Sequence, residues 1–391
     1  MLLSLSIVFI LGLLANKLFT TFKLPGFLGM FLVGIVIGPN FLNIISPELL
    51  SFSSDLRKLA LIIILLRAGL SLGKSQLMSN HTVILKMSII PCIIEGATIA
   101  IASIYIFGFS IVQGGMLGFI IAAVSPAVVI PAMLELQKNS NTKKVSTIIL
   151  AGASVENVLA ITLFSTFLGF YENVNTDLLL KLSNVPISII LGVASGIITG
   201  FCIVYLSKRY HIRDTKKVII IISVAILLTS LESLLQNKIG VASLLGVMTI
   251  GFILLEMLPV AAKRLSEKFS KIWVIAEILL FVLVGAEVNV LGVLDIFTKG
   301  IIIIFIGLIA RTIGVIISTY GHNLTMREQL FCCISYIPKA TVQASIGAIP
   351  LAMGVASGEL MLSIAVLAIL ITTPIGAIGI RLVSKNLTNV R

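Results

Sequence analysis

The stretch Ala151-Gly152-Ala153-Ser154-Val155-Glu156-Asn157-Val158-Leu159-Ala160-Ile161 places one glutamate in the middle of an apolar run that extends from Val145 to Phe170. A run of this length can cross a bilayer, because about 20 apolar residues span its hydrocarbon core. A charged side chain at that depth costs roughly 2.5–3.5 kcal/mol on insertion scales. Such residues commonly line an ion or proton pathway, or serve as pair partners inside a helix bundle. We interpret Glu156 as a transport or proton-relay residue, with a structural pairing role as the alternative.

The composition of the whole chain is typical of a polytopic membrane protein. Of its 391 residues, 58% are hydrophobic and 11% are charged, whereas soluble domains average about 25% charged residues. Short connections separate thirteen apolar runs, at residues 3–20, 25–43, 58–73, 83–107, 113–136, 145–171, 182–207, 217–235, 239–257, 269–290, 297–320, 327–353 and 360–383. The pattern predicts an all-α membrane protein of about 13 transmembrane helices, with residues 1–391 forming a single polytopic transporter domain.

The basic residues of the loops predict the orientation of the chain. Alternate loops and the C-terminal tail hold most of them, namely Lys17, Lys23, Lys74, Lys138, Lys143, Lys144, Lys208, Arg209, Arg213, Lys216, Lys217, Lys263, Arg264, Lys268, Lys271, Arg327, Arg381, Lys385 and Arg391. The opposite loops hold only Arg57, Lys58, Lys181, Lys238 and Lys299. By the positive-inside rule we expect the N-terminus outside and the C-terminus in the cytoplasm. The net charge of +12 therefore reflects topology and does not indicate a nucleic-acid partner.

Two of the predicted spans are interrupted by proline among small and hydroxyl residues. One reads Ala122-Ala123-Val124-Ser125-Pro126-Ala127-Val128-Val129-Ile130-Pro131, and the other reads Tyr336-Ile337-Pro338-Lys339-Ala340-Thr341-Val342-Gln343-Ala344-Ser345-Ile346-Gly347. Proline breaks the helical hydrogen-bond ladder, and membranes tolerate the freed backbone only where it lines a cavity or packs in protein. An ordinary kink would explain Pro126 or Pro338 alone. Interruptions at corresponding places in two five-span halves instead predict a transport site near the midplane.

Ionisable residues of both signs fall inside the predicted spans. They are Arg67, Arg311, Lys339, Glu95, Glu156, Glu287 and Glu277. An unpaired buried charge costs several kcal/mol, so we expect these groups to pair within the bundle. Lys339 and Arg311 would supply fixed positive charge where the ends of the interrupted helices meet.

The oxygen-bearing residues near Glu156 suggest what it binds. One carboxyl group can hold a proton or bind a cation, but it cannot do both at once. A site of this kind that is reached alternately from each side of the membrane is an antiporter. Asn157, the hydroxyls of Ser125 and Ser154, and carbonyls freed near Pro126 could complete an oxygen shell. Such a shell suits Na⁺ or Li⁺, by analogy with the oxygen ligands of other hard cations.

Four stretches carry a resemblance to a known family. They are Arg67-Ala68-Gly69-Leu70, Ser125-Pro126-Ala127-Val128-Val129-Ile130-Pro131, Leu283-Val284-Gly285-Ala286-Glu287-Val288 and Ile337-Pro338-Lys339-Ala340-Thr341-Val342-Gln343-Ala344. Over essentially its whole length the chain resembles the monovalent cation:proton antiporter (sodium/hydrogen exchanger) superfamily, and it is most similar to the NHA branch.

The resemblance implies a fold of 13 spans with two inverted five-helix repeats and crossing discontinuous helices. It implies a core (transport) domain at about 83–171 and 297–383, and a dimerisation or scaffold domain at about 1–73 and 182–290. It further implies a homodimer in the cell (plasma) membrane that exchanges Na⁺ or Li⁺ for H⁺ by an elevator-type movement.

The resemblance also assigns roles to individual residues. The ion-binding pair of the family matches Glu156-Asn157, Arg311 matches a core arginine, and Glu95 resembles the acidic partner of that arginine. Electrogenic members carry two aspartates at the pair and electroneutral members carry asparagine then aspartate, so the usual ligand position is here Asn157. Either Glu156 has taken over the ligand role, or the site is weakened, altered in ion choice or inactive. We favour the first interpretation, which predicts one H⁺ per cation and electroneutral exchange.

Other functions remain as alternatives. These are a transporter of another cation or solute on the same fold, including a sodium-coupled symporter, and a regulatory homologue that has lost transport. A channel is less favoured because the sequence has no filter-like repeat. We expect no enzymatic activity and no cofactor, and the expected metal is only the transient Na⁺ or Li⁺ at Glu156 and Asn157. The expected partners are these ions, H⁺, lipid and a second copy of the chain, with no nucleic acid.

Overall fold

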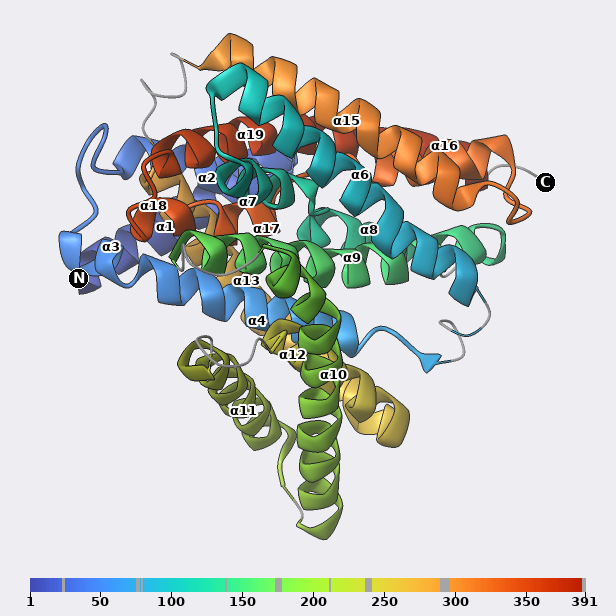
Figure 1. Ribbon diagram of the computed structural model, residues 1–391. Coiled ribbons are helices and arrows are strands. Elements are labelled where there is room, and N and C mark those ends of the chain that lie inside the picture. Colours follow the sequence, from blue (N-terminus) through green and yellow to red (C-terminus); the bar gives the residue numbers. More distant parts are fainter. Residues whose placement is uncertain are drawn as a thin grey trace. The chain divides into compact units, whose positions relative to one another are not determined.

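The computed structural model describes the chain apart from residues 23–24, 75–77, 79, 138, 173–177, 211, 236–240, 289–295 and 389–391. Every secondary-structure element in the described part is a helix (Figure 1), which confirms the predicted all-α class. Of the basic residues used above to predict orientation, Lys23, Lys138, Lys238 and Arg391 lie outside the described residues.

The helices of the first half, as far as α10, are α1 Leu2–Thr21, α2 Gly26–Ile37, α3 Pro47–Ser51, α4 Ser53–Gly69, α6 His81–Phe107, α7 Ile111–Ala122, α8 Pro126–Leu136, α9 Ser140–Glu172 and α10 Leu178–Arg209. The remaining helices are α11 Asp214–Leu235, α12 Ser243–Met257, α13 Pro259–Ala286, α15 Phe297–Thr319, α16 Met326–Ser335, α17 Thr341–Ile346, α18 Ile349–Ala352 and α19 Gly358–Thr388.

Eight stretches of the described chain are helical, apolar and long enough to cross a membrane. They are Leu2–Thr21, His81–Phe107, Ile111–Leu136, Thr142–Tyr171, Pro186–Arg209, Pro259–Ala286, Phe297–Thr319 and Gly358–Lys385. Other apolar runs form shorter helices, such as the 12 residues of α2, which extend only about 18 Å at 1.5 Å per residue. The protein is therefore a multi-pass membrane protein, and both the count of 13 spans and the inverted repeat stay predictions.

Many of the basic residues that the sequence pattern assigned to loops lie inside helices, Lys17, Lys143 and Lys208 among them. The basic residues from Lys263 to Lys271 lie within helix α13 and not in a loop. Arg57 also lies inside a helix, α4, where it is buried. Arg67, expected within a span, lies in the last turn of α4. Hydropathy reports where polar residues are, but lysine and arginine are good helix formers, so a helix can continue through a polar stretch.

The described chain divides into two compact units. The first comprises Met1–Lys58, Thr82–Tyr171 and Glu277–Arg391, and the second comprises Leu59–His81 and Glu172–Ala276. The first unit contains all the residues predicted to form the transport site. The division into core and scaffold domains drawn from the family resemblance remains a prediction.

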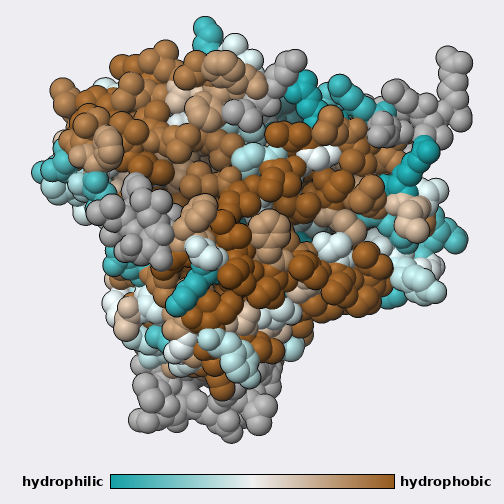
Figure 2. Space-filling view, turned by 90° about the horizontal axis from the view of Figure 1, so that it is seen from above, coloured by the Kyte–Doolittle hydropathy of each residue, from teal (hydrophilic) through white to brown (hydrophobic). Residues whose placement is uncertain are grey.

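Glycines allow close approach of helices within the first unit. A Cβ on Gly118 of α7 would fall against the carbonyl of Gly96 in α6, and one on Gly314 of α15 would meet the backbone of Pro91 in α6. Figure 1 shows α6 and α15 running alongside each other. Both helices also expose large apolar side chains, including Ile101 and Ile309. Hydrophobic side chains dominate the face in Figure 2, as lipid contact requires.

The second unit is held together by a close contact between glycines and by polar contacts. A Cβ on Gly196 of α10 would meet the backbone of Gly246 in α12. The backbone amide of Lys74 donates to a carboxylate oxygen of Glu256 over 2.7 Å. Arg264 of α13 donates to the carboxylate of Asp214 at the start of α11 over 2.6 Å.

Candidate functional site

Both predicted helix interruptions are present. Helix α7 ends at Ala122, the backbone is extended at Ala123 and Ser125, and α8 begins at Pro126. Pro126 occupies the first helical turn, where its missing N–H leaves no hydrogen bond unmade. In the second interruption, α16 ends at Ser335 and α17 begins only at Thr341. The proline-containing stretches therefore divide their spans, as predicted.

The two interruptions are in direct contact. The backbone N–H of Ser125 donates to the carbonyl of Pro338 over 2.9 Å. The hydroxyl oxygens of Ser125 and Thr341 lie 3.4 Å apart. Segments more than 200 residues apart in sequence thus meet through backbone groups that the helix breaks set free.

The carbonyls at the end of α7 are bound by side chains from other helices. Nε2 of Gln343, in α17, lies within hydrogen-bonding distance of the carbonyls of Ile120 (3.0 Å), Ile121 (3.3 Å) and Ala123 (2.7 Å). Arg311, in α15, donates from its NH2 atom to the carbonyl of Ala122. Gln343 stood in a family motif, but nothing in the sequence indicated this role.

Four buried charged side chains form one cluster beside the interruptions. Oε2 of Glu95 in α6 accepts from Nζ of Lys339 over 2.8 Å and also from Nε of Arg311. The NH1 atom of Arg311 lies 2.9 Å from Oε1 of Glu156 in α9. All four side chains are at most 1% exposed. The expectation that charges of both signs pair within the bundle is confirmed for these residues.

Several polar atoms of the cluster have no hydrogen-bond partner in the described structure. With the neighbouring Asn157 included, they are Oε1 of Glu95, both carboxylate oxygens of Glu156, both amide atoms of Asn157, and NH1 of Arg311. The contact between Glu156 and Arg311 is therefore a close ion pair without hydrogen-bond alignment. Glu156 is 0% and Asn157 is 1% exposed. Buried polar atoms without partners are rare and commonly mark a place for water or an ion.

Two of the predicted oxygen ligands are partly committed to other partners. The hydroxyl of Ser154 donates to the carbonyl of Leu150 within its own helix over 2.7 Å. The hydroxyl of Ser125, fully buried, faces Thr341. A hydroxyl retains lone pairs after donating its hydrogen, so both oxygens can still accept a ligand.

Helix α19 holds the second interruption in place. The backbone N–H of Lys339 donates to the hydroxyl oxygen of Thr372 over 3.0 Å. The hydroxyl of Thr373 donates to the Lys339 carbonyl over 2.5 Å. The backbone of Lys339 is thus fixed on both sides while its ammonium group reaches Glu95. In the sequence, only the position of Thr372 and Thr373 directly before Pro374 hints that these hydroxyls bind the backbone of Lys339.

A second ion pair, between a buried arginine and a partly exposed glutamate, lies elsewhere in the first unit. NH1 of Arg57 donates to Oε2 of Glu287 over 2.9 Å. Glu287 was expected inside a span, but it directly follows the end of α13 at Ala286. Arg57 had been assigned to a loop from its polarity alone. The structure instead makes it the partner of an acid 230 positions later.

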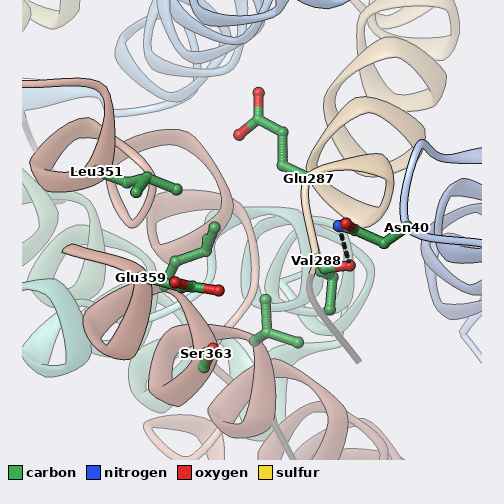
Figure 3. A pocket seen from close by; sticks show the side chains of 8 residues that line it. Asn40, Glu287, Val288, Leu351, Glu359 and Ser363 are labelled. Carbon is green, nitrogen blue, oxygen red and sulfur yellow. Dashed lines mark hydrogen bonds between the residues drawn. The ribbon is translucent and has the colours of Figure 1, made fainter. Parts of the chain in front are cut away.

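Two of the cavities in the described part of the chain are lined by residues of the first unit. The larger, about 1550 Å³, is lined by residues of the α1–α2 region, of α8 (Ala127, Val128 and Pro131 among them) and of α19. Ala127 and Val128 directly follow the Ser125-Pro126 break, so this cavity borders the first interruption. The smaller, about 290 Å³, has Asn40 and Glu287 on one side and Glu359, Leu351 and Ser363 on the other (Figure 3).

Comparison with known proteins assigns this arrangement to a family. The family described as "Sodium/hydrogen exchanger, transmembrane" matches residues 5–385. The chain belongs to the sodium/hydrogen exchanger family. Its members are transporters and not enzymes, and the resemblance inferred from the sequence motifs is confirmed at the level of the superfamily.

The exchanger has similar curated relatives and solved structures. It is 33% identical to human "Sodium/hydrogen exchanger 9B2" over 397 residues, which cover 97% of this chain and 72% of that protein. It is 31% identical to human "Sodium/hydrogen exchanger 9B1" over 374 residues, covering 91% and 71%. The sodium proton antiporter MjNhaP1 from Methanocaldococcus jannaschii matches with a TM-score of 0.82 and 19% identity over 99% of this chain and 98% of that one. At that identity the likeness concerns the fold alone.

Proposed function

We propose that this exchanger moves Na⁺ or Li⁺ against H⁺ by alternating access, and that Glu156 carries either the proton or the cation. The family supports cation:proton antiport in general. The observation that carries the specific assignment is the buried Glu156-Asn157 pair, whose side-chain oxygens and amide nitrogen have no hydrogen-bond partner in the described part of the chain. The Asn157 amide oxygen would join Glu156 in the cation shell, with Ser125 and Ser154 as further oxygen donors.

The charge of the cluster supports a stoichiometry of one H⁺ per cation. The carboxylates of Glu95 and Glu156 balance the positive charges of Arg311 and Lys339. Either a proton or a Na⁺ ion at Glu156 then adds one positive charge. The two loaded states have equal charge, so exchange between them moves no net charge.

The ion pair with Arg311 compensates the charge of Glu156. The guanidinium lies 2.9 Å from Glu156 and balances a carboxylate that would otherwise be costly in the membrane. An arriving proton or cation would replace part of this interaction. Because Arg311 also contacts Glu95 and Ala122, it remains held while Glu156 changes partner.

One cavity favours access to the first interruption from the cytoplasmic side. The cavity of about 1550 Å³ reaches the first turn of α8. The larger cavity is lined in part by Glu135, Arg381 and Lys385. By the positive-inside rule these residues lie on the cytoplasmic side. We therefore propose that this cavity leads toward the first interruption from the cytoplasm. We further propose that the N-terminus lies outside, the C-terminus inside, and that the protein resides in the plasma membrane.

Oligomeric state is part of the proposal. Helix α1 exposes a row of large apolar residues: Leu2, Leu3, Ile10, Leu13, Leu14 and Leu18. Such a face can contact lipid or a second copy of the chain. The proposed assembly is the homodimer that the family resemblance implies, with residues 1–73 and 182–290 as scaffold and residues 83–171 and 297–383 as the moving core.

The test is cation-dependent dissipation of a pH gradient in proteoliposomes. Addition of Na⁺ or Li⁺ should collapse the gradient with wild-type protein, and Glu156→Gln should reduce the rate to that of protein-free liposomes. Glu267→Gln is the matched control, since it removes an exposed carboxylate of α13 far in sequence from the site, and it should retain the wild-type rate.

Three results would contradict parts of the proposal. Sodium-driven proton movement by Glu156→Gln would remove Glu156 as the carrier. A membrane potential generated by wild-type turnover would exclude the one-to-one stoichiometry. A folded wild-type protein with no cation-dependent proton flux would favour the transport-deficient alternative. Asn157, at the usual ligand position, is the sequence feature that favours this alternative.

A further inference from the structure

The end of α7 is where elementary electrostatics would place a cation. The last four carbonyls of a helix have no partner within that helix, and they carry the negative end of its dipole. In transporters with broken helices, such carbonyls commonly coordinate the transported ion. The sequence therefore suggested that carbonyls freed near Pro126 belong to the cation shell. In this structure, the carbonyls of Ile120, Ile121 and Ala123 lie against Gln343, and that of Ala122 lies against Arg311.

We propose that Gln343 is a specificity-determining residue, which acts by positioning and not by binding the ion. Its amide keeps the α7 carbonyls away from the transported cation. Selectivity is then set by side-chain oxygens, chiefly those of Glu156 and Asn157. This inference rests on the proposed function, because it assumes that a cation binds beside the helix interruptions.

The geometry of Gln343 suits this role. Its side chain is fully buried in α17. Its two amide hydrogens serve three carbonyls at 2.7–3.3 Å, which fixes the plane of the amide. Its Oε1 has no hydrogen-bond partner in the described part of the chain. The hydrogen bonds of the side chain are thus made by its amide nitrogen, as expected of a group that binds backbone carbonyls.

The neutrality of glutamine also matters at this position. Arg311 and Lys339 already provide two positive charges, and Glu95 and Glu156 balance them. A lysine or arginine at position 343 would bind the same carbonyls but leave one charge uncompensated in a buried cluster, which is strongly unfavourable. An amide satisfies the carbonyls without changing the charge that the cation and the proton experience.

Removing the amide should create carbonyl ligands for a cation. Buried carbonyls that lose their donor tend to acquire water or an ion. Rings of backbone carbonyls can replace the hydration shell of K⁺. Variants without the Gln343 amide should therefore bind K⁺ better relative to Na⁺, by about tenfold or more, because three acceptors become available at once.

The experiment measures binding without turnover. Purified protein in detergent is titrated with Na⁺, Li⁺ or K⁺, and the cation-dependent rise in melting temperature gives an apparent affinity for each ion. Gln343→Met removes the donors at nearly constant volume. Gln343→Asn keeps the amide but shortens the side chain by one methylene, and it serves if the Met variant does not fold. Ser345→Ala is the matched control, because the hydroxyl of Ser345 donates within its own helix, to the Val342 carbonyl.

The expected result is a Na⁺-to-K⁺ affinity ratio that falls about tenfold in Gln343→Met and stays at the wild-type value in Ser345→Ala. In Gln343→Asn the ratio should fall in the same direction, because the shorter side chain no longer brings its amide to all three carbonyls. An unchanged ratio in a folded Gln343 variant would overturn the inference, as would an equal change in the control. Failure of the proposed function would look different. Wild-type protein would then show no proton flux in proteoliposomes, while the change in cation binding between wild type and Gln343→Met would still decide the role of Gln343.

Discussion

Nζ of Lys339 donates to Oε2 of Glu95 over 2.8 Å, linking helix α6 to a break in the chain 244 residues later. The same oxygen accepts from Nε of Arg311. One carboxylate therefore compensates two cations, and both lie in or beside the interrupted helices. The position of Glu95 determines how much positive charge remains for Glu156 to balance.

Replacement of Glu95 should destabilise the fold and disturb the site. Glu95→Gln leaves two buried cations and only one carboxylate, and breaking a buried pair in this way costs about 3–5 kcal/mol. We expect a lower melting temperature and weaker cation binding. Adding Lys339→Met to Glu95→Gln restores charge balance and should recover part of the melting temperature. Thermal unfolding in detergent gives the melting temperatures of the single and the double variant. A Glu95→Gln protein as stable as wild type would show that the ion pair between Glu95 and Lys339 contributes little to stability.

A second carboxylate at the ion-binding pair should change the stoichiometry. Asn157→Asp places an acid next to Glu156, in a space where Asn157 now has no hydrogen-bond partner among the described residues. Two carboxylates allow two protons to exchange for one cation, and turnover would then carry net charge. A voltage-sensitive dye in proteoliposomes should report a potential for Asn157→Asp and none for wild type. Equal signals from the two proteins would show that residue 157 does not set the stoichiometry.

Close packing of α6 against α7 should make Gly118 intolerant of a side chain. A Cβ there would fall against the carbonyl of Gly96, whereas one on Gly169, inside α9, would have no atom within 4 Å. Overpacking commonly costs about 1–3 kcal/mol, so Gly118→Ala should lower the melting temperature. Gly169→Ala, also inside a helix, should leave it unchanged or raise it slightly, since alanine favours the helix by roughly 0.5–1 kcal/mol. Similar melting temperatures for the two variants would contradict the close approach.

The ion pairs of the second unit predict a pH effect. The hydrogen bond from Arg264 holds the pKa of the Asp214 carboxyl below its ordinary value of 3.8, aided by Lys217 at 3.6 Å. A carboxyl with a lowered folded-state pKa stabilises the fold above its unfolded-state pKa, and that contribution disappears as the pH falls through the folded-state pKa. Asp214→Asn should therefore melt below wild type near pH 7, and the difference should shrink below about pH 4. A difference that is independent of pH would exclude this mechanism.

Much of the site was predictable because its elements are unusual in a membrane. Three features are costly in a bilayer unless they have partners: a carboxylate amid apolar residues, two prolines among small residues, and basic residues within spans. That buried charges of both signs pair followed from the cost of buried charge, and Glu95 as the partner of Arg311 followed from the family resemblance. The contacts of Lys339 with Glu95 and of Arg311 with Glu156 came only from the structure. The helical content followed from composition. Helix boundaries were predicted less well, because α13 and α4 continue through basic residues that hydropathy assigns to loops.

The amino-acid sequence by itself determined that the chain is a helical membrane protein with interrupted spans and a buried acid at position 156, because hydropathy and proline act locally. Only the tertiary structure decided which freed backbone groups meet. That Pro338 accepts from Ser125, that Gln343 and Arg311 occupy the carbonyls of α7, and that Asn157 has no hydrogen-bond partner among the described residues all depend on segments distant in sequence being brought together. Hydrogen bonds depend on distances of a few tenths of an ångström and on direction, which no local pattern of residue types specifies.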